Sequence, residues 1–267
     1  MDNSLVDSDW DLARHRQELD VQGFTVLPNL MPEAKRLAAL RRMDALFAEE
    51  GERAGWEFKS EPTARRLANL VNKGEIFVEL IAHPVVLELV RHVIGPEFKL
   101  GSLNGRDATP NSTAGQPLHV DMGMLPDGQG PCGCNTMWML DPFTSENGPL
   151  RIVPGSHLSG RRPQEVLADP QEPHPEEIYV TGAAGTVVVV NTHAWHGGTA
   201  NRTSGPRRTL HAFYVRRDKP QQLWQKRWLS TGLQGSLSAE LRWLLALDDP
   251  LNDEISAAPE VTSGFMK

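Results

Sequence analysis

The sequence predicts a mainly β protein with flanking helices: a double-stranded β-helix (jelly roll, cupin-like) buttressed by N-terminal helices. Helical periodicity is concentrated in the first third of the chain, whereas short apolar segments separated by Gly, Pro, Asn and Asp dominate the rest. Regularly spaced short strands of this kind are typical of closed or double-sheet β architectures. The 267 residues contain no recognisable linker and are expected to form one domain. Within it, residues 1–97 would be largely helical support, 98–217 the jelly-roll core and 218–267 a C-terminal helical extension.

Two helices are expected in the first third. Pro32-Glu33-Ala34 opens a stretch, running from Leu37 to Phe47, in which apolar residues recur three or four positions apart. A second such stretch extends from Pro84 to Ile94 and is stopped by Gly95-Pro96. Each has an apolar stripe that must pack on another element.

The strands are expected as short apolar or alternating segments, each bounded by turn residues. In a jelly roll, strands distant in sequence lie side by side, and the mouth between the sheets encloses a cavity. Site residues would then stand on rigid strands. The expected strands run from Lys99 to Gly105, Leu118 to Met122, Asn135 to Leu140, Leu150 to Val153, Glu177 to Val180, Gly185 to Val190 and Thr209 to Val215.

His119, Asp121 and His196, in the segments HVD and WHGG, are candidate metal ligands. Side chains at i and i+2 of an extended strand point to the same face, so His119 and Asp121 can reach a common point. Two imidazoles and one carboxylate on one face of an octahedron leave three positions open, which suits a non-heme ferrous ion that handles oxygen. An H-x-D triplet alone is more often a solvated or hydrogen-bonded pair.

Arg207 strengthens this interpretation. It lies eleven residues after His196 and follows a turn at residues 203–206 that leads into an apolar strand. A guanidinium beside the metal can clamp a carboxylate through two parallel hydrogen bonds, and its charge does not titrate away. A dicarboxylate co-substrate would fit.

Four other histidines compete for the third ligand position. His193 precedes His196 by three residues, and either could face the metal. His174, in PQEPHPEE, is expected in an exposed loop, and His157, in PGSH, as a turn-capping or hydrogen-bonded residue. His211 is a further candidate, and Trp195 is expected to be a core aromatic.

From about Gly23 to Tyr214 the chain resembles the phytanoyl-CoA dioxygenase family of Fe(II)- and 2-oxoglutarate-dependent oxygenases. The resemblance is carried by GFTVLPNLM, HPVVLELVRHVIGPEFKL, QPLHVDMG, NTMWMLDPFTSENGPLRIVPGSH and GTVVVVNTHAWHGGTANRTSGPRRTLHAFY. It implies that His119, Asp121 and His196 bind iron and that Arg207 holds the far carboxylate of 2-oxoglutarate. The spacing of His196, eleven residues from both Gly185 and Arg207, matches the family pattern and selects it among the histidines.

The resemblance also implies further co-substrate contacts. Thr136 and Trp138 lie two apart on one strand, and the corresponding face in the family lines the 2-oxoglutarate pocket; ordinary sheet packing is the alternative. Gln116 could hydrogen-bond the co-substrate or an iron-bound water, or be solvated. Close relatives often carry serine where Gly198 stands, so a hydroxyl contact there is missing.

The expected function is therefore that of an Fe(II)- and 2-oxoglutarate-dependent dioxygenase, which uses O2 to hydroxylate or otherwise oxidise an unactivated C–H bond of a small metabolite or natural-product intermediate. By resemblance, a carboxylate at Asp121 argues for oxygenation over halogenation. The alternatives are a non-catalytic jelly-roll ligand-binding protein and a cupin-type metalloenzyme without 2-oxoglutarate, neither of which needs Arg207. Substrate walls are expected from Asn104, Arg106, Met122, Met124, Arg161 and residues 224–228.

Composition excludes several partners. A net charge of -7 and a pI near 5.7 argue against nucleic acid or an anionic membrane surface, both of which need a clustered basic face. Cys132 and Cys134 are expected to be reduced packing residues. The chain shows no secretion signal and no apolar run of membrane-spanning length, so it is expected to be cytoplasmic, with its oligomeric state left open.

Overall fold

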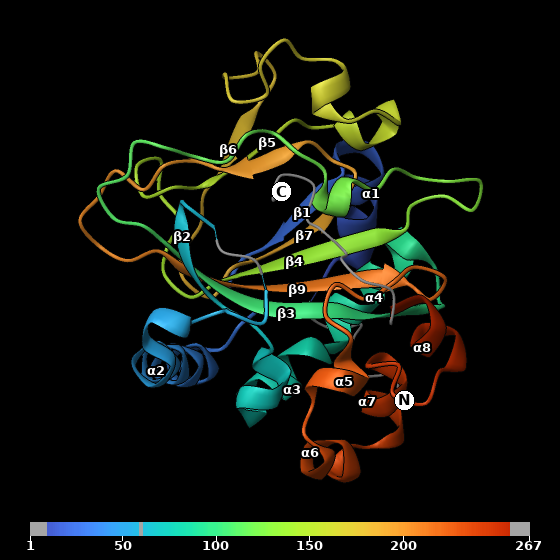
Figure 1. Ribbon diagram of the computed structural model, residues 1–267. Coiled ribbons are helices and arrows are strands. Elements are labelled where there is room, and N and C mark those ends of the chain that lie inside the picture. The colour runs from blue at the N-terminus through green and yellow to red at the C-terminus, as the bar shows by residue number, and fades with distance from the viewer. Residues whose placement is uncertain (1–9, 59–60, 257–267) are drawn as a thin grey trace.

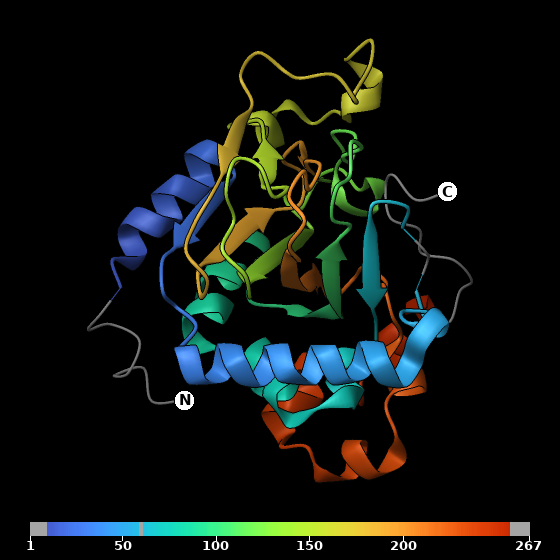
Figure 2. The ribbon, with the colours of Figure 1, turned by 90° about the vertical axis from the view of Figure 1, so that its left-hand side faces the viewer.

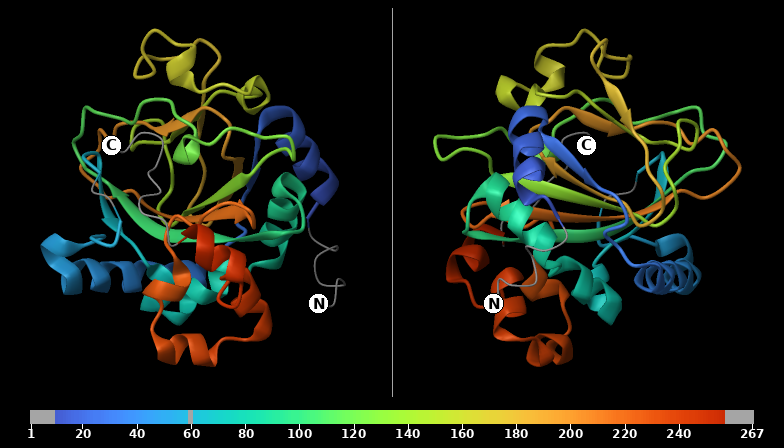
Figure 3. Two further views of the ribbon diagram at one scale, coloured as in Figure 1. Left: turned by 45° about the vertical axis from the view of Figure 1, so that its right-hand side comes forward. Right: turned by 180° about the vertical axis from the view of Figure 1, so that it is seen from behind.

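The computed structural model describes residues 10–58 and 61–256, and two facing antiparallel sheets dominate them (Figure 1). The larger sheet lies between the smaller one and a layer of helices (Figures 1 and 3). Its strands are, in spatial order, β1 (Phe24–Leu27), β7 (Val187–Asn191), β4 (Gly133–Met139), β9 (Arg208–Arg216), β3 (Phe98–Ala108) and β2 (Ala64–Leu67).

The smaller sheet consists of β6 (Ile178–Val180), β5 (Leu150–Ile152) and β8 (His196–Gly198), in that order. Buried side chains of both sheets meet in one apolar cluster, which includes Met139 of β4, Ile152 of β5 and Val188 of β7. Burial of these apolar groups holds the two sheets face to face. The predicted jelly roll is confirmed.

Helices cover the outer face of the larger sheet. In the N-terminal part these are α1 (Leu12–Gln22), α2 (Glu33–Glu50), α3 (Glu75–Ile81) and α4 (Pro84–Ile94), and α2 lies across the underside of the sheet (Figure 2). The C-terminal part adds α5 (Gln225–Trp228), α6 (Thr231–Ser236), α7 (Ala239–Leu244) and α8 (Pro250–Ser256). Short 3-10 turns are η2 (Gly51–Arg53), η3 (Leu70–Lys73), η4 (Asp121–Gly123), η5 (Ser156–Ser159) and η6 (Pro163–Glu165).

The main hydrophobic core lies between these helices and the sheet. Val86 and Leu89 of α4 are fully buried and belong to the same cluster as Trp138 and Tyr214. The Tyr214 hydroxyl donates to the carbonyl of Ile81 at 2.8 Å, which satisfies its polar end inside the core. The outward-facing residues of the central strands therefore serve packing, and only the inward-facing ones can form a site.

The two predicted helices are present, and α4 has the predicted bounds. The sequence marks both ends of this helix: a proline stands in its first turn, and Gly95, at φ 82, follows its last turn. The strand expected from Leu118 to Met122 is wrong: His119 makes one isolated bridge to His196, and the turn η4 follows, with Met122 at φ 54. The first third also contributes β1 and β2, the two edge strands of the larger sheet.

Two smaller expectations also have outcomes. Cys132 and Cys134 are buried and free of disulfides, and burial raises the pKa of both thiols. None of the helices within residues 10–58 and 61–256 is long and apolar enough to cross a membrane.

Candidate metal centre and its pocket

The HVD segment is fastened to β8 by backbone hydrogen bonds. The N–H of His119 donates to the carbonyl of His196 at 2.9 Å, and the N–H of His196 donates back at 3.0 Å. Asp121 N–H donates to the carbonyl of Thr192 at 3.1 Å. Val120 between them is extended, at φ -106 and ψ 144, so the side chains of His119 and Asp121 still share a face without a regular strand.

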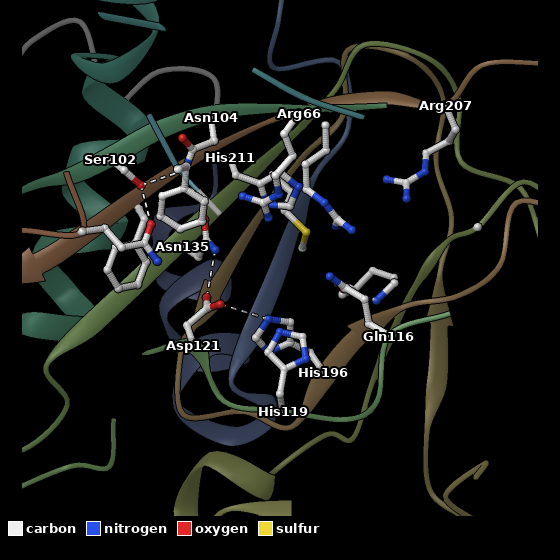
Figure 4. A pocket seen from close by; sticks show the side chains of 18 of the residues that line it. Arg66, Ser102, Asn104, Gln116, His119, Asp121, Asn135, His196, Arg207 and His211 are labelled. Atoms are coloured by element: carbon white, nitrogen blue, oxygen red, sulfur yellow. Dashed lines mark hydrogen bonds and ion pairs between the residues drawn. The ribbon is translucent and has the colours of Figure 1, made fainter. Parts of the chain in front are cut away.

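His119, Asp121 and His196 converge on one point (Figure 4). One ligand atom from each lies within 4.8 Å of the other two. Nδ1 of His119 lies 2.9 Å from the carbonyl of Pro117, and Nδ1 of His196 lies 2.9 Å from that of Ala194. Because carbonyls only accept, each ring carries its proton on Nδ1 and presents the lone pair of Nε2 to the common point.

The carboxylate of Asp121 is also held in place. Its Oδ2 accepts a hydrogen bond from Nδ2 of Asn135 at 2.9 Å, and its Oδ1 lies 3.7 Å from Nε2 of His196. Burial and the neighbouring His196 lower the pKa of His119 to about 3, so this imidazole is neutral at physiological pH. Neutral imidazole and carboxylate are the forms that bind metal, and this donor set fits iron(II).

Arg151, a buried residue of β5, supports the HVD segment from behind. Its Nη2 donates to the carbonyls of Gln116 at 3.1 Å and Pro170 at 2.7 Å. Pro170 in turn accepts the N–H of Leu118 at 2.8 Å. Outer contacts of this kind orient ligands, so Arg151 is a positioning residue for His119.

A cavity that is continuous with solvent opens beside the three side chains. The strands β3, β9 and β4 form its floor, and residues of the smaller sheet close the other side. Phe143, Leu150, Met137 and Phe213 give it an apolar part. Its polar lining is Arg66, Ser102, Asn104, Arg106, Gln116, His119, Asp121, Asn135, His196, Arg207, His211 and Gln222.

Arg207 faces the three candidate ligands across the cavity (Figure 4). Only 2% of it is exposed, and its guanidinium carbon lies 4.5 Å from the centroid of the Phe143 ring. Its Nε has no hydrogen-bond partner among the described residues. Burial and nearby Arg106 hold the pKa of Arg207 below its usual range. A buried cation with an unused donor is unfavourable unless an anion joins it, which fits the far carboxylate of a keto diacid.

Arg208, the next residue, points to the other face of β9, as expected for neighbours on a strand. It forms ion pairs with Asp141, at 2.8 Å, and with Asp44, at 2.8 Å. Its role is structural, because Asp44 of α2 and Asp141 both lie outside the cavity lining.

Glu61 organises the polar wall between Arg66 and Gln116. It accepts hydrogen bonds from Nε of Arg66 at 2.7 Å, from Nε of Arg106 at 3.0 Å and from Nε2 of Gln116 at 2.8 Å. Although burial favours the neutral acid, the Arg106 and Arg66 guanidiniums hold the pKa of Glu61 well below its usual range. Glu61 is therefore a buried carboxylate, and the sequence analysis missed it because no local pattern links it to these partners.

Gln116 lines the cavity, as expected, and its amide is already engaged. Besides its bond to Glu61, its Oε1 accepts the N–H of Gly198 at 2.8 Å. A Cβ added at Gly198 would lie 3.2 Å from that same Oε1. The absence of a side chain at Gly198 therefore makes room for the Gln116 amide.

The assignment of Thr136 and Trp138 to the pocket is corrected by the structure. Trp138 Nε1 donates to Thr136 Oγ1 at 3.0 Å, and both residues are buried against the helix layer, where the Trp138 ring lies 5.8 Å from that of His83. The residues of β4 that line the cavity are Asn135 and Met137. The alternation was recognised and the face was chosen wrongly, because both faces of this central strand are buried.

The competing histidines have other roles. His193 uses both ring nitrogens, with Nδ1 3.0 Å from the carbonyl of Met124 and Nε2 accepting the N–H of Cys132 at 3.1 Å. His157 bonds the carbonyl of Asp20 at 3.2 Å. His174, expected to be exposed, is half-buried and 6.1 Å from the ring of the buried Trp195. His211 lines the cavity from β9.

Of the expected substrate walls, Asn104 and Arg106 line this cavity, whereas Met122, Met124, Arg161 and residues 224–228 do not. The cavity residues that sequence reasoning missed are Phe58, Arg66, Ser102, Asn135, Met137, Phe143, Gly148, Leu150, Phe213 and Gln222. Ser102 was recoverable, because it precedes Asn104 by two positions on the same strand.

Comparison with known proteins adds family evidence. Residues 19–209 match the family described as phytanoyl-CoA dioxygenase (PhyH). The dioxygenase af480 of Aspergillus fumigatus is 25% identical over 246 residues, covering 89% of this chain and 76% of its own. The L-proline trans-4-hydroxylase of Streptomyces griseoviridis is 25% identical over 218 residues, covering 70% and 80%.

Among solved structures, the chain is similar to the non-heme alpha-ketoglutarate-dependent epimerase SnoN from nogalamycin biosynthesis. The TM-score is 0.63 at 21% identity, with 78% of this chain and 83% of SnoN covered. This likeness concerns the fold.

Proposed function

Because the chain belongs to the phytanoyl-CoA dioxygenase family and is a non-heme iron and 2-oxoglutarate dioxygenase, we propose that it hydroxylates an unactivated C–H bond of a small metabolite or natural-product intermediate. The observation that carries this proposal is the convergence of His119, Asp121 and His196 on one side of a cavity that has Arg207 on the other. A non-catalytic binding protein has no need of either feature.

Each residue has a definite part in this proposal. His119, Asp121 and His196 would hold iron(II), which when bound supplies, together with 2-oxoglutarate and O2, the oxidising power of the reaction. Arg207 would receive the far carboxylate of 2-oxoglutarate, which would give its buried guanidinium an anionic partner. Asn135 fixes the Asp121 carboxylate, so that Oδ1 remains directed to the metal position.

The apolar walls of the cavity control how water and the substrate reach the metal position. Phe143, Leu150, Met137 and Phe213 exclude water from the apolar part of the cavity and position a substrate carbon near the three ligands. The Asp121 carboxylate occupies the position that a halide would need, which supports oxygenation over halogenation. Hydroxylation is supported by the similarity to the L-proline trans-4-hydroxylase.

The proposal is tested with Asp121→Ala and His196→Ala. Iron(II) is added anaerobically with 2-oxoglutarate, and the visible charge-transfer absorption is recorded. Succinate formation is then measured in air. Both variants should lose the absorption and the succinate, because each lacks one of three ligands. His92→Ala is the control: this histidine is on the outer surface of α4, where it pairs with Asp20. Near-normal succinate formation by either ligand variant would refute the assignment.

A further inference from the structure

The floor of the cavity is a small grid of side chains from three adjacent strands. Ser102, Phe213 and Asn135 are aligned across β3, β9 and β4, and all face the cavity. Asn104, His211 and Met137 form the next aligned row on the same face. Alternation along each strand makes both rows point inward, so this surface is presented to whatever binds beside the metal position.

Two side-chain amides on this floor carry acceptor atoms that have no hydrogen-bond partner among the described residues. Asn135 must turn Nδ2 to Asp121, since a carboxylate only accepts, and this leaves its Oδ1 directed elsewhere. Asn104 donates through Nδ2 to Ser102 Oγ at 3.1 Å, while that hydroxyl donates to Gln222 Oε1 at 2.6 Å. Both Oδ1 atoms are buried and have no partner among the described residues. A ligand that donates hydrogen bonds would satisfy them.

The guanidinium of Arg66 lies near this floor. Arg66 is 12% exposed, lines the cavity, and enters it near His211 (Figure 4). Its Nε binds Glu61, and its guanidinium carbon lies 5.0 Å from the Phe58 ring. Neither terminal nitrogen has a hydrogen-bond partner within residues 10–58 and 61–256. Arg66 therefore has both terminal NH2 groups available for an anion.

The charges of the cavity do not balance. Its lining contains the guanidiniums of Arg66, Arg106 and Arg207 and the carboxylate of Asp121, and Glu61 adds one carboxylate directly behind. One positive charge is left over. A divalent metal and a doubly charged co-substrate cancel each other, so the excess persists when both are bound. An ammonium group would increase it, whereas a single anionic group would remove it.

We propose that the primary substrate is a monoanionic acid whose carboxylate is received by Arg66 and whose neutral donor, a hydroxyl or an amide N–H, is received by Asn104 and Asn135. Resting on the proposed function, this inference narrows it to hydroxy acids and N-acylated amino acids. Free amino acids are disfavoured, because their ammonium group would lie in a cavity that is already positive. The aromatic face of Phe213, between Ser102 and Asn135, supports the carbon skeleton.

The test measures binding, which does not depend on turnover. Protein loaded with zinc(II) and 2-oxoglutarate is titrated with N-acetyl amino acids and 2-hydroxy acids, and with the free amino acid and the neutral primary amide of the same skeleton. Isothermal titration calorimetry gives the affinities. The N-acetyl amino acids and 2-hydroxy acids should bind about 10-fold to 150-fold more tightly than the matched amides, the range expected for one charged hydrogen-bonding contact.

Arg66→Gln should remove this preference, whereas Arg65→Gln should keep it. Arg65 is the neighbouring residue on β2; 64% of its side chain is exposed, and it pairs with Asp107 outside the cavity. Both variants remove one guanidinium from β2, but only Arg66→Gln removes it from the cavity. Asn104→Leu offers an independent measure: it should reduce the affinity of a 2-hydroxy acid to that of the same acid without the hydroxyl.

Charge-transfer absorption of the anaerobic iron(II) protein with 2-oxoglutarate separates the two proposals. It should persist in Arg66→Gln, which also shows that the variant is folded. If Arg66→Gln loses 2-oxoglutarate binding, Arg66 belongs to the co-substrate site and the inference is wrong. Equal affinity for acids and amides, tighter binding of free amino acids, or binding by none of the acids would each overturn it as well, while leaving the iron and 2-oxoglutarate assignment untouched.

Discussion

Replacing Arg207 with glutamine isolates the co-substrate clamp. Arg207 is buried, its Nε is unpaired among the described residues, and its charge is repelled by Arg106. Without 2-oxoglutarate the guanidinium has no carboxylate in direct contact among the described residues, and with 2-oxoglutarate it gains one. The substitution should weaken 2-oxoglutarate binding strongly without lowering the stability of the free protein.

The expected size follows from the burial of the site. Truncating one partner of a buried, hydrogen-bonded charge pair costs about 2–5 kcal/mol. At about 1.4 kcal/mol for each factor of ten, the dissociation constant of 2-oxoglutarate should rise about 30-fold to about 4,000-fold. An exposed ion pair would give less than about 1 kcal/mol.

Anaerobic titration of the iron(II) protein with 2-oxoglutarate, followed by charge-transfer absorption, measures this constant. Urea unfolding of the free protein measures stability. Arg208→Gln is the matched control: the adjacent residue, on the opposite face of β9, loses ion pairs with Asp141 and Asp44. It should lower the free energy of unfolding and leave the dissociation constant unchanged. A dissociation constant within threefold of wild type for Arg207→Gln would show that the clamp lies elsewhere.

Three further predictions concern the surroundings of the site. Thr136→Val removes the hydroxyl that bonds Trp138 and the Ala212 carbonyl, so it should cost about 1–3 kcal/mol of stability by urea unfolding and leave the 2-oxoglutarate KM unchanged; a tenfold rise in KM would return Thr136 to the pocket. Glu61→Gln should cost about 3–5 kcal/mol at pH 7, because it leaves two buried guanidiniums without their carboxylate. Since the folded pKa of Glu61 is depressed below its ordinary 4.5, the stabilisation is fully present above that pH and is lost as pH falls below it. The stability gap between wild type and Glu61→Gln should therefore narrow in acid, and a gap that widens would contradict the assignment. Arg151→Met should weaken iron(II) binding about 10-fold to 100-fold by equilibrium titration, since Arg151 holds the carbonyls of Gln116 and Pro170 behind His119; unchanged affinity would show that the HVD segment holds its position without it.

The sequence was sufficient for the parts of this molecule that have a local signature. The helix α4 has a proline start, an apolar stripe and a glycine stop, and its bounds were predicted correctly. The spacing between HVD, WHGG and Arg207 likewise singled out residues that the fold brings to one cavity.

What the sequence could not give depends on tertiary contacts. Asp121 lies in a turn, and long-range contacts hold it beside the other ligands: its backbone bond to Thr192, the side-chain bond from Asn135 and the bridge between His119 and His196. Glu61 joins Arg66, five residues further on, to Arg106 and Gln116, which lie 45 and 55 residues away in the sequence. Thr136 and Trp138 show a further limit: on a strand buried on both faces, alternation does not reveal which face holds the cavity.

The bridge between His119 and His196 has a consequence for biogenesis. Along the chain, Asp121 precedes His196 by 75 positions and His119 precedes it by 77. The strand β1 likewise pairs with β7, which lies in the last third of the sequence. A ribosome-bound chain that ends before residue 196 has neither the complete donor set nor the closed sheet. The complete donor set can therefore assemble only after synthesis has passed His196.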